Sequence, residues 1–149
     1  MPQIDLSGTG VKETDAAALS DIAGLSADSR AVRPGFLFAA ITGAKEDGRR
    51  FIPEALAAGA SVVLAMPGTQ LPAGVSARLV TSDAPRRTLA LLAARFYGAQ
   101  PETVVAVTGT NGKTSTVHFC RQLWEALGAR AASIGTLGLL GPGIAREGG

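Results

Sequence analysis

The chain has 149 residues, enough for about one domain, or one domain and part of another. Hydrophobic residues make up 46% and charged residues 17%, a balance that excludes a disordered tail or a charged linker. The net charge of +2 comes from 14 basic and 12 acidic residues with no basic stripe, so nothing indicates a nucleic-acid partner.

Strand-like and helix-like segments alternate along the first part of the chain, which predicts an α/β architecture. The apolar run 36–41, which follows Pro-Gly, is expected to be a buried strand. The β-branched run 61–65 and the segment 78–81 predict two more strands. Residues 52–58 predict a short helix, with proline tolerated in its first turn.

The clearest helix of this part follows Asp83, whose side chain is expected to cap it. Pro85 stands early in the helix, apolar residues then recur at helical spacing, and Gly98 ends it. Residues 98–102, Gly-Ala-Gln-Pro-Glu, predict a domain boundary. We therefore expect one domain over residues 1–98 and the start of a second over residues 103–149.

The second part begins with a strand pattern at 103–107, of the kind found in buried parallel sheets. A glycine-bearing turn leads into a helix that ends at Gly128, and residues 131–134 are expected to start the next strand. Together these predict one βαβ unit. The chain finishes at 141–149 as a loop begins, and we expect it to be a fragment. The helix places five residues on one apolar face: Val117, Cys120, Leu123, Trp124 and Leu127.

The turn between that strand and that helix reads T-G-T-N-G-K-T-S, residues 108–115. Glycines allow successive backbone N–H groups to point at phosphate oxygens, and the helix N-terminus adds partial positive charge. Lys113 would reach the β- and γ-phosphates, and the hydroxyl of Thr114 would bind Mg²⁺. The first glycine of the usual pattern is replaced by Val107, so the loop is a variant. The alternative is a tight turn with an exposed lysine.

With its displaced glycine, the segment 108–115 resembles the ATP loop of the Mur ligases of peptidoglycan synthesis. Three further motifs occur in the order typical of the N-terminal domain of the MurE type: D-S-R at 28–30, P-G-F-L-F-A at 34–39 and D-G-R-R-F-I at 47–52. The I-G-T-L-G of 134–138 resembles the strand end that follows the ATP loop in this family. The resemblance extends over most of the chain.

The resemblance implies a small N-terminal domain for a UDP-linked substrate, followed by the first βαβ portion of a P-loop ATPase domain. It implies an ATP-dependent amide ligase that requires Mg²⁺. Such an enzyme adds a diamino acid, with meso-diaminopimelate expected, to UDP-MurNAc-L-Ala-D-Glu through an acyl phosphate. The 149 residues alone are expected to be inactive and monomeric.

By position, the resemblance assigns the UDP-substrate contacts to two segments, the region of the D-S-R motif and the loop at 44–46. Without the resemblance, D-S-R could be only a polar turn with a local Asp–Arg pair. Similarly, 45–47 could be only a solvated loop. The resemblance makes Lys113 the catalytic residue and Thr114 the metal ligand. The full assignments are Ala27, Ser29, Ala44, Lys45 and Glu46 for the UDP-substrate, and Gly109, Thr110, Asn111, Gly112, Lys113, Thr114 and Ser115 for ATP.

Three alternatives remain open: another Mur ligase, a folylpolyglutamate-type ligase, or a nucleotide-binding module without catalysis. His118, the one histidine, is expected to be an ordinary helix position. The lone Cys120, the absence of a signal-peptide pattern and the lack of a long apolar run favour a cytoplasmic protein with no membrane span.

Overall fold

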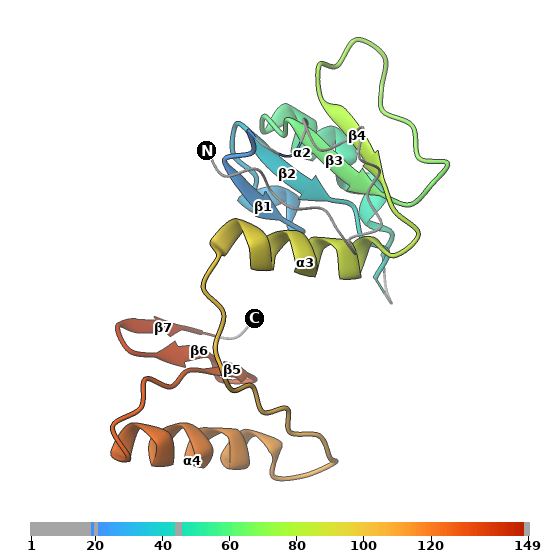
Figure 1. Ribbon diagram of the computed structural model, residues 1–149. Helices are drawn as coiled ribbons and strands as arrows, with labels where there is room; N and C mark the ends of the chain where they lie inside the picture. The colour runs from blue at the N-terminus through green and yellow to red at the C-terminus, as the bar shows by residue number, and fades with distance from the viewer. Residues whose placement is uncertain (1–18, 20, 44–45, 148–149) are drawn as a thin grey trace. The chain divides into compact units, whose positions relative to one another are not determined.

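A computed structural model describes residues 19, 21–43 and 46–147 of the chain (Figure 1). The chain divides into two compact units, residues 1–100 and residues 101–149, and each is described by itself. Within the described residues, no helix has both the length and the apolar character needed to cross a membrane.

The first unit is built on a sheet of four parallel strands that lie side by side in chain order (Figure 1). This confirms the α/β class and the strands expected from the three apolar runs. The first strand went unpredicted, because a three-residue Gly-Leu-Ser segment carries no readable alternation. The strands are β1 (Gly24–Ser26), β2 (Phe36–Ala39), β3 (Val62–Ala65) and β4 (Arg78–Thr81).

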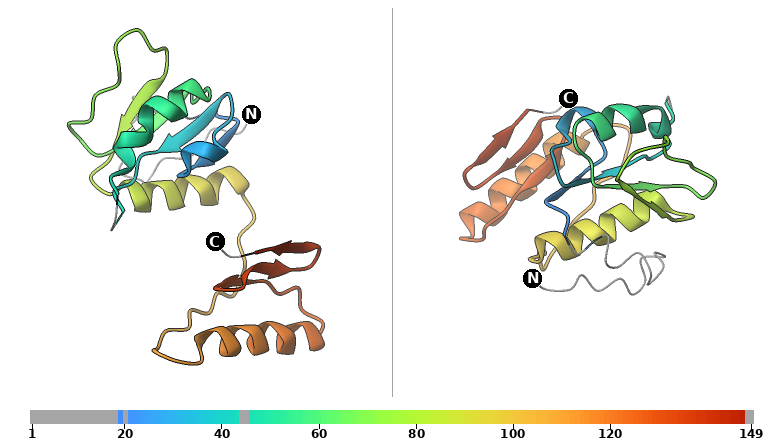
Figure 2. Two further views of the ribbon diagram at one scale, coloured as in Figure 1. Left: turned by 180° about the vertical axis from the view of Figure 1, so that it is seen from behind. Right: turned by 90° about the horizontal axis from the view of Figure 1, so that it is seen from above.

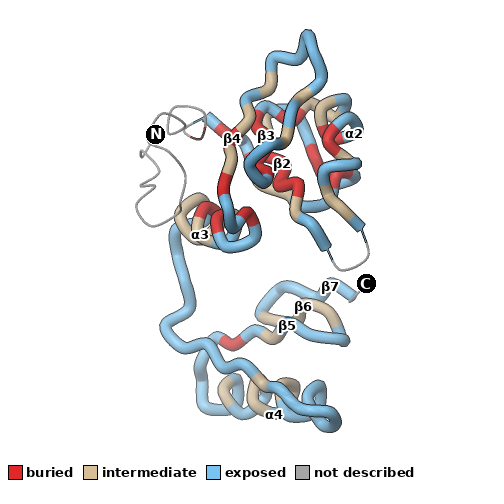
Figure 3. Tube along the Cα trace, turned by 90° about the vertical axis from the view of Figure 1, so that its right-hand side faces the viewer, coloured by how far each residue is buried: buried red, intermediate tan, exposed pale blue. Residues whose placement is uncertain are grey.

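Both faces of this sheet are covered, which explains why β2 and β3 are apolar throughout. On one face Leu37 and Leu64 pack with Leu92 of helix α3 (Pro85–Tyr97). On the other face Phe38 packs with Ile52 of helix α2 (Ile52–Ala57). Figure 2 shows the two helices on opposite sides of the sheet, and Figure 3 shows the buried residues concentrated between them. Two short 3₁₀ helices lie in the connections that follow β1 and β2: η2 (Ser29–Ala31) after β1 and η3 (Gly48–Phe51) after β2.

The start of α3 differs from the expectation. Its N-cap position is Ala84, and Asp83 is exposed and makes no capping hydrogen bond. The backbone N–H of Ala84 instead donates to the hydroxyl oxygen of Ser82 at 3.1 Å. Ser82 is buried, whereas Asp83 is exposed to water. The hydrogen bond that stabilises the turn before α3 is therefore made by Ser82. The end of the helix at Gly98 is as predicted.

The described part of the second unit, residues 101–147, consists of one helix and three short antiparallel strands (Figure 1). Helix α4 (Lys113–Ala126) confirms the predicted helix. It is followed by β5 (Ser133–Gly135), β6 (Gly138–Gly141) and β7 (Ile144–Arg146). After β5 the chain turns at Thr136 and Leu137, and β6 pairs antiparallel with β5.

The βαβ unit predicted for this part is wrong in two respects. Residues 103–107 form no strand, and Val104 and Val105 are 77% and 56% exposed. In addition, β5 pairs with β6 in an antiparallel hairpin rather than with a preceding parallel strand. A parallel strand is stable only beside a neighbour that takes up its N–H and C=O groups. The described part of the second unit places no such neighbour beside 103–107.

The apolar face predicted for α4 is only partly covered. Val117, Cys120 and Trp124 are half-buried, whereas Leu123 and Leu127 are 63% and 81% exposed. No residue of α4 is fully buried, so this unit has a much smaller core than the first.

Candidate functional site

The predicted phosphate loop curves tightly before α4. Gly109 has φ +141° and Gly112 has φ +75°, both in the region that residues with a β-carbon rarely adopt. None of the backbone N–H groups of residues 110–112 donates a hydrogen bond within the described part of the chain. The N–H groups of residues 113–115 at the start of α4 have no intrahelical partner either, and the first that does is that of Thr116, which donates to the carbonyl oxygen of Gly112 at 2.9 Å. A run of free amide donors therefore leads into a helix N-terminus, where an anion is favoured.

Lys113 is the first residue of α4, and its side chain folds over the loop. Its ammonium donates to the carbonyl oxygen of Gly109 and lies 3.4 Å from the carbonyl oxygen of Thr110. The positive charge is thus held over the curve of the loop. Phosphate oxygens are stronger acceptors than these carbonyls and would displace them as partners of the ammonium.

Thr114 faces the strand region of the same unit. Its hydroxyl lies 3.4 Å from the hydroxyl of Thr136, at the turn between β5 and β6. The two threonines, with Lys113 and His118, line part of a hollow of about 230 Å³. The Nδ1 atom of His118 is buried and has no hydrogen-bond partner in the described structure. The Lys113 side chain and two hydroxyl-bearing side chains therefore line one small hollow.

The remaining loop residues, Asn111 and Ser115, are exposed. The described residues hold no group of three or more His, Cys, Asp or Glu that could bind a metal ion. A magnesium ion here would need a ligand set of the kind it prefers beside nucleotides, in which one hydroxyl is joined by water and phosphate oxygens. Thr114, which follows Lys113 at the helix N-terminus, carries a hydroxyl of this kind.

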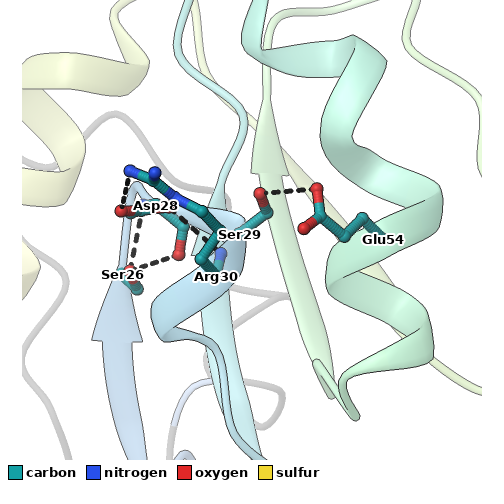
Figure 4. A network of polar contacts seen from close by, with 5 residues as sticks. All are labelled: Ser26, Asp28, Ser29, Arg30 and Glu54. Atoms are coloured by element: carbon teal, nitrogen blue, oxygen red, sulfur yellow. Dashed lines mark hydrogen bonds and ion pairs between the residues drawn. The ribbon is translucent and has the colours of Figure 1, made fainter.

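In the first unit, Ser29 lies just beyond β1 and is only 7% exposed. Its hydroxyl donates to the carboxylate of Glu54 on α2 at 2.9 Å (Figure 4). The neighbouring Asp28 accepts from the backbone N–H and the guanidinium of Arg30. The local Asp–Arg pair considered from the sequence is therefore present, and Ser29 has a separate partner that is distant in the chain.

Asp28 and Asp47, the acidic residues that precede η2 and η3, each have a lowered pKa because each accepts hydrogen bonds from an arginine two residues further along the chain. The side-chain hydrogen bond from Arg49, followed by its backbone N–H, lowers the pKa of Asp47 from 3.8 to about 2. The same two kinds of bond from Arg30 lower the pKa of Asp28. Both acids accept from the backbone N–H two residues ahead, so they cap η2 and η3 as well.

Ala27 is exposed in the bend after β1, and Glu46 is exposed on the loop after β2, where it pairs with Arg50 at 3.1 Å. Because β1 and β2 are parallel neighbours, both segments leave the same edge of the sheet. The structure thus brings the two predicted groups to one edge. Ala44 and Lys45 lie outside the described residues.

Two residues of these regions went unrecognised in the sequence. Glu54 is 25 positions from Ser29, and Thr136 is 22 positions from Thr114. No spacing rule links positions so far apart. The I-G-T-L-G segment was the one signal that pointed to Thr136.

The structure is that of an α/β protein in which a loop with two positive-φ glycines leads into a helix N-terminus. Family comparison extends this description. Residues 21–97 match the model described as Mur ligase family, catalytic domain, and residues 107–145 match the Mur ligase middle domain. The chain belongs to the Mur ligase family.

Its relatives are named as diaminopimelate ligases. The chain is 51% identical over 138 residues to the UDP-N-acetylmuramoyl-L-alanyl-D-glutamate–2,6-diaminopimelate ligase of Bradyrhizobium diazoefficiens, covering 93% of this chain and 28% of that protein. It is 50% identical over 144 residues to the protein of the same name from Rhizobium meliloti, covering 93% and 29%. The chain spans just over a quarter of the length of these curated relatives.

Two solved structures are similar. One is a UDP-N-acetylmuramoyl-L-alanyl-D-glutamate–2,6-diaminopimelate ligase, at 33% identity and a TM-score of 0.60, covering 83% of this chain and 26% of that one. The other is the MurF ligase of Thermotoga maritima in complex with ADP, at 34% identity and a TM-score of 0.54, covering 73% and 24%.

Proposed function

We propose that this chain supplies two parts of an ATP-dependent amide ligase that adds meso-diaminopimelate to UDP-MurNAc-L-Ala-D-Glu. Residues 1–98 would bind the UDP end of the substrate, and residues 103–149 would carry the start of the ATP-binding domain. The observation that carries the proposal is the loop at 109–115, where unpaired amides and the Lys113 ammonium meet at the start of α4. The names of the relatives support the choice of substrates.

In this proposal Gly109 to Ser115 surround the phosphates of ATP, and Thr114 contributes the hydroxyl ligand of Mg²⁺. ATP supplies the phosphoryl group that turns the D-glutamate carboxylate into an acyl phosphate, which the amine of the diamino acid then attacks with release of phosphate. A carboxylate is a poor electrophile, and a good leaving group overcomes that barrier. The part of Lys113 is to offset the negative charge of the phosphates during transfer, while the loop amides position them.

The UDP end is proposed to lie at the sheet edge after β1 and β2, against Ala27, Ser29, Ala44, Lys45 and Glu46. The parallel pairing of β1 and β2 supports this, because ligands of parallel sheets bind where strands end. We further propose a cytoplasmic monomer whose partners are these small molecules alone.

A chimaera tests the function. The segment of the Bradyrhizobium diazoefficiens ligase that aligns with this chain is replaced by residues 1–149. We expect the purified chimaera to form the amide product and release phosphate only when ATP, Mg²⁺, UDP-MurNAc-L-Ala-D-Glu and diaminopimelate are all present. L-Lysine in place of diaminopimelate distinguishes the diamino acid. A chimaera that melts cooperatively but makes no product, while the parent ligase does, would contradict the proposal.

A further inference from the structure

The hydrogen bond between Ser29 and Glu54 determines which way the serine hydroxyl is used. Ser29 donates its single hydroxyl hydrogen to Oε2 of Glu54. The Ser29 oxygen is then left with acceptor capacity and no hydrogen to give. Any further group that meets this oxygen has to be a hydrogen-bond donor.

The position of Glu54 is set by the core. Glu54 stands in the first turn of α2, between Ile52 and Ala55, which are 4% and 0% exposed. α2 packs against η2, which carries Ser29. The carboxylate is therefore held beside the serine by a buried helix face rather than by a flexible loop (Figure 4).

The charges around Ser29 add to this restriction. Asp28 and Arg30 form an ion pair at 2.8 Å and neutralise each other, whereas Glu54 forms no ion pair within the described residues. Among the described residues, those bonded to Ser29 or next to it in the chain carry two carboxylates and one guanidinium. A phosphate group placed here would meet a net negative charge, and a neutral donor would not.

We propose that Glu54 is a positioning residue that fixes Ser29 as an acceptor for a neutral donor of the uridine part of the substrate, with the diphosphate lying away from Ser29. The inference rests on the proposed binding of the UDP end by the first unit. It adds Glu54 to that site and specifies that Ser29 accepts a hydrogen bond there. The base or sugar of the nucleotide, which both carry neutral N–H or O–H donors, faces the end of β1.

A double-mutant cycle on the 149-residue chain tests it, with UDP-MurNAc-L-Ala-D-Glu, uridine and inorganic pyrophosphate as probes in calorimetric titrations. We expect Ser29→Ala and Glu54→Ala each to weaken the binding of uridine and of the UDP-substrate about 10-fold, and the double variant to be no weaker than either single one. Glu54→Gln keeps a carbonyl acceptor and is expected to bind within about threefold of the unchanged chain. Asp83→Ala removes an exposed carboxylate of the same unit and serves as the matched control with unchanged binding.

The outcomes separate the inference from the proposed function. If the unchanged chain binds neither uridine nor the UDP-substrate, the assignment of the first unit fails and the inference fails with it. If the unchanged chain binds but Glu54→Ala binds uridine equally well, or if its loss adds fully to that of Ser29→Ala, only the inference is overturned. Weakened binding of pyrophosphate in Glu54→Ala, with uridine unaffected, would also overturn it. Thermal melts of each variant ensure that the affinities compared are those of folded protein.

Discussion

Gly48 lies directly against the backbone of Ile41. Its N–H donates to the Ile41 carbonyl oxygen at 3.1 Å, and a β-carbon at Gly48 would overlap that oxygen and lie 2.7 Å from the Ile41 nitrogen. The D-G-R-R-F-I motif therefore has a structural explanation: Asp47 caps η3, and Gly48 leaves room for the chain that returns from β2. The motif shapes the loop at the sheet edge where the UDP end is proposed to bind.

Replacing Gly48 by alanine should lower the free energy of unfolding by about 1–3 kcal/mol, because the new methyl group meets backbone that cannot move aside easily. Urea denaturation measures the change. Gly135→Ala is the matched control, since nothing lies within 4 Å of a β-carbon there and no positive φ is required. A Gly48→Ala chain as stable as the control would contradict the close approach.

The turn before α3 predicts a difference between two adjacent residues. Ser82→Ala should lower the free energy of unfolding by about 1–2 kcal/mol, because it removes a buried 2.8 Å contact with the Thr88 hydroxyl and the acceptor for the Ala84 N–H. Asp83→Ala should change it by less than about 0.5 kcal/mol, because Asp83 is exposed and caps nothing. Chemical denaturation of both variants decides the matter, and the reverse ranking would restore Asp83 as the cap.

The low pKa of Asp47 predicts a loss of stability in acid. The carboxyl group has a pKa of 3.8 when free and about 2 in the folded chain, so its contribution to stability is complete above about pH 4. That contribution is lost as the pH falls from about 4 to about 2, where the folded protein must also take up the proton. The midpoint of thermal unfolding should therefore fall over this range.

Asp47→Asn tests the source of this pH dependence. The variant cannot titrate at this position, so its thermal midpoint should fall less steeply over the same range. Asp28, whose pKa is also lowered, retains its share of the effect in the variant. The pair with Arg49 is exposed, and 1 M salt should reduce the difference between the two proteins. Identical curves for both proteins would show that Asp47 does not contribute.

Lys113 should be needed for ligation but not for binding of the UDP-substrate. Its ammonium lies over the phosphate loop, in the second unit, whereas the proposed UDP contacts belong to the first. In the chimaera, Lys113→Ala is expected to lower the rate of phosphate release by about 100-fold or more. Calorimetry should show the affinity for UDP-MurNAc-L-Ala-D-Glu nearly unchanged.

Arg130→Ala provides the comparison for Lys113, because it removes an exposed positive charge of the same unit outside the loop. It should leave the rate close to that of the unchanged chimaera. Turnover retained in Lys113→Ala, or an equal loss in Arg130→Ala, would show that the ammonium over the loop has no special part.

Much of the first unit could be predicted from the sequence. β2 and β3 are buried on both faces, so their apolar runs stand out, and α3 shows its period through Leu89 and Leu92. The beginning of α3 was misassigned because Asp83 and Ser82 are both good capping residues, and burial alone separates them. The strand at 103–107 was predicted from composition, but composition does not supply a neighbouring strand.

The sequence by itself determined the local features: which runs are apolar enough to be strands, where glycine permits a tight loop, and that a lysine and a threonine begin the helix after it. These depend on neighbours within a few residues, and so they can be read along the chain. Only the tertiary structure decided that Glu54 receives the hydrogen of Ser29 and that Thr136 stands beside Thr114. Such pairs form because packing of the sheet and helices brings distant segments together, and no local pattern records which segments will meet.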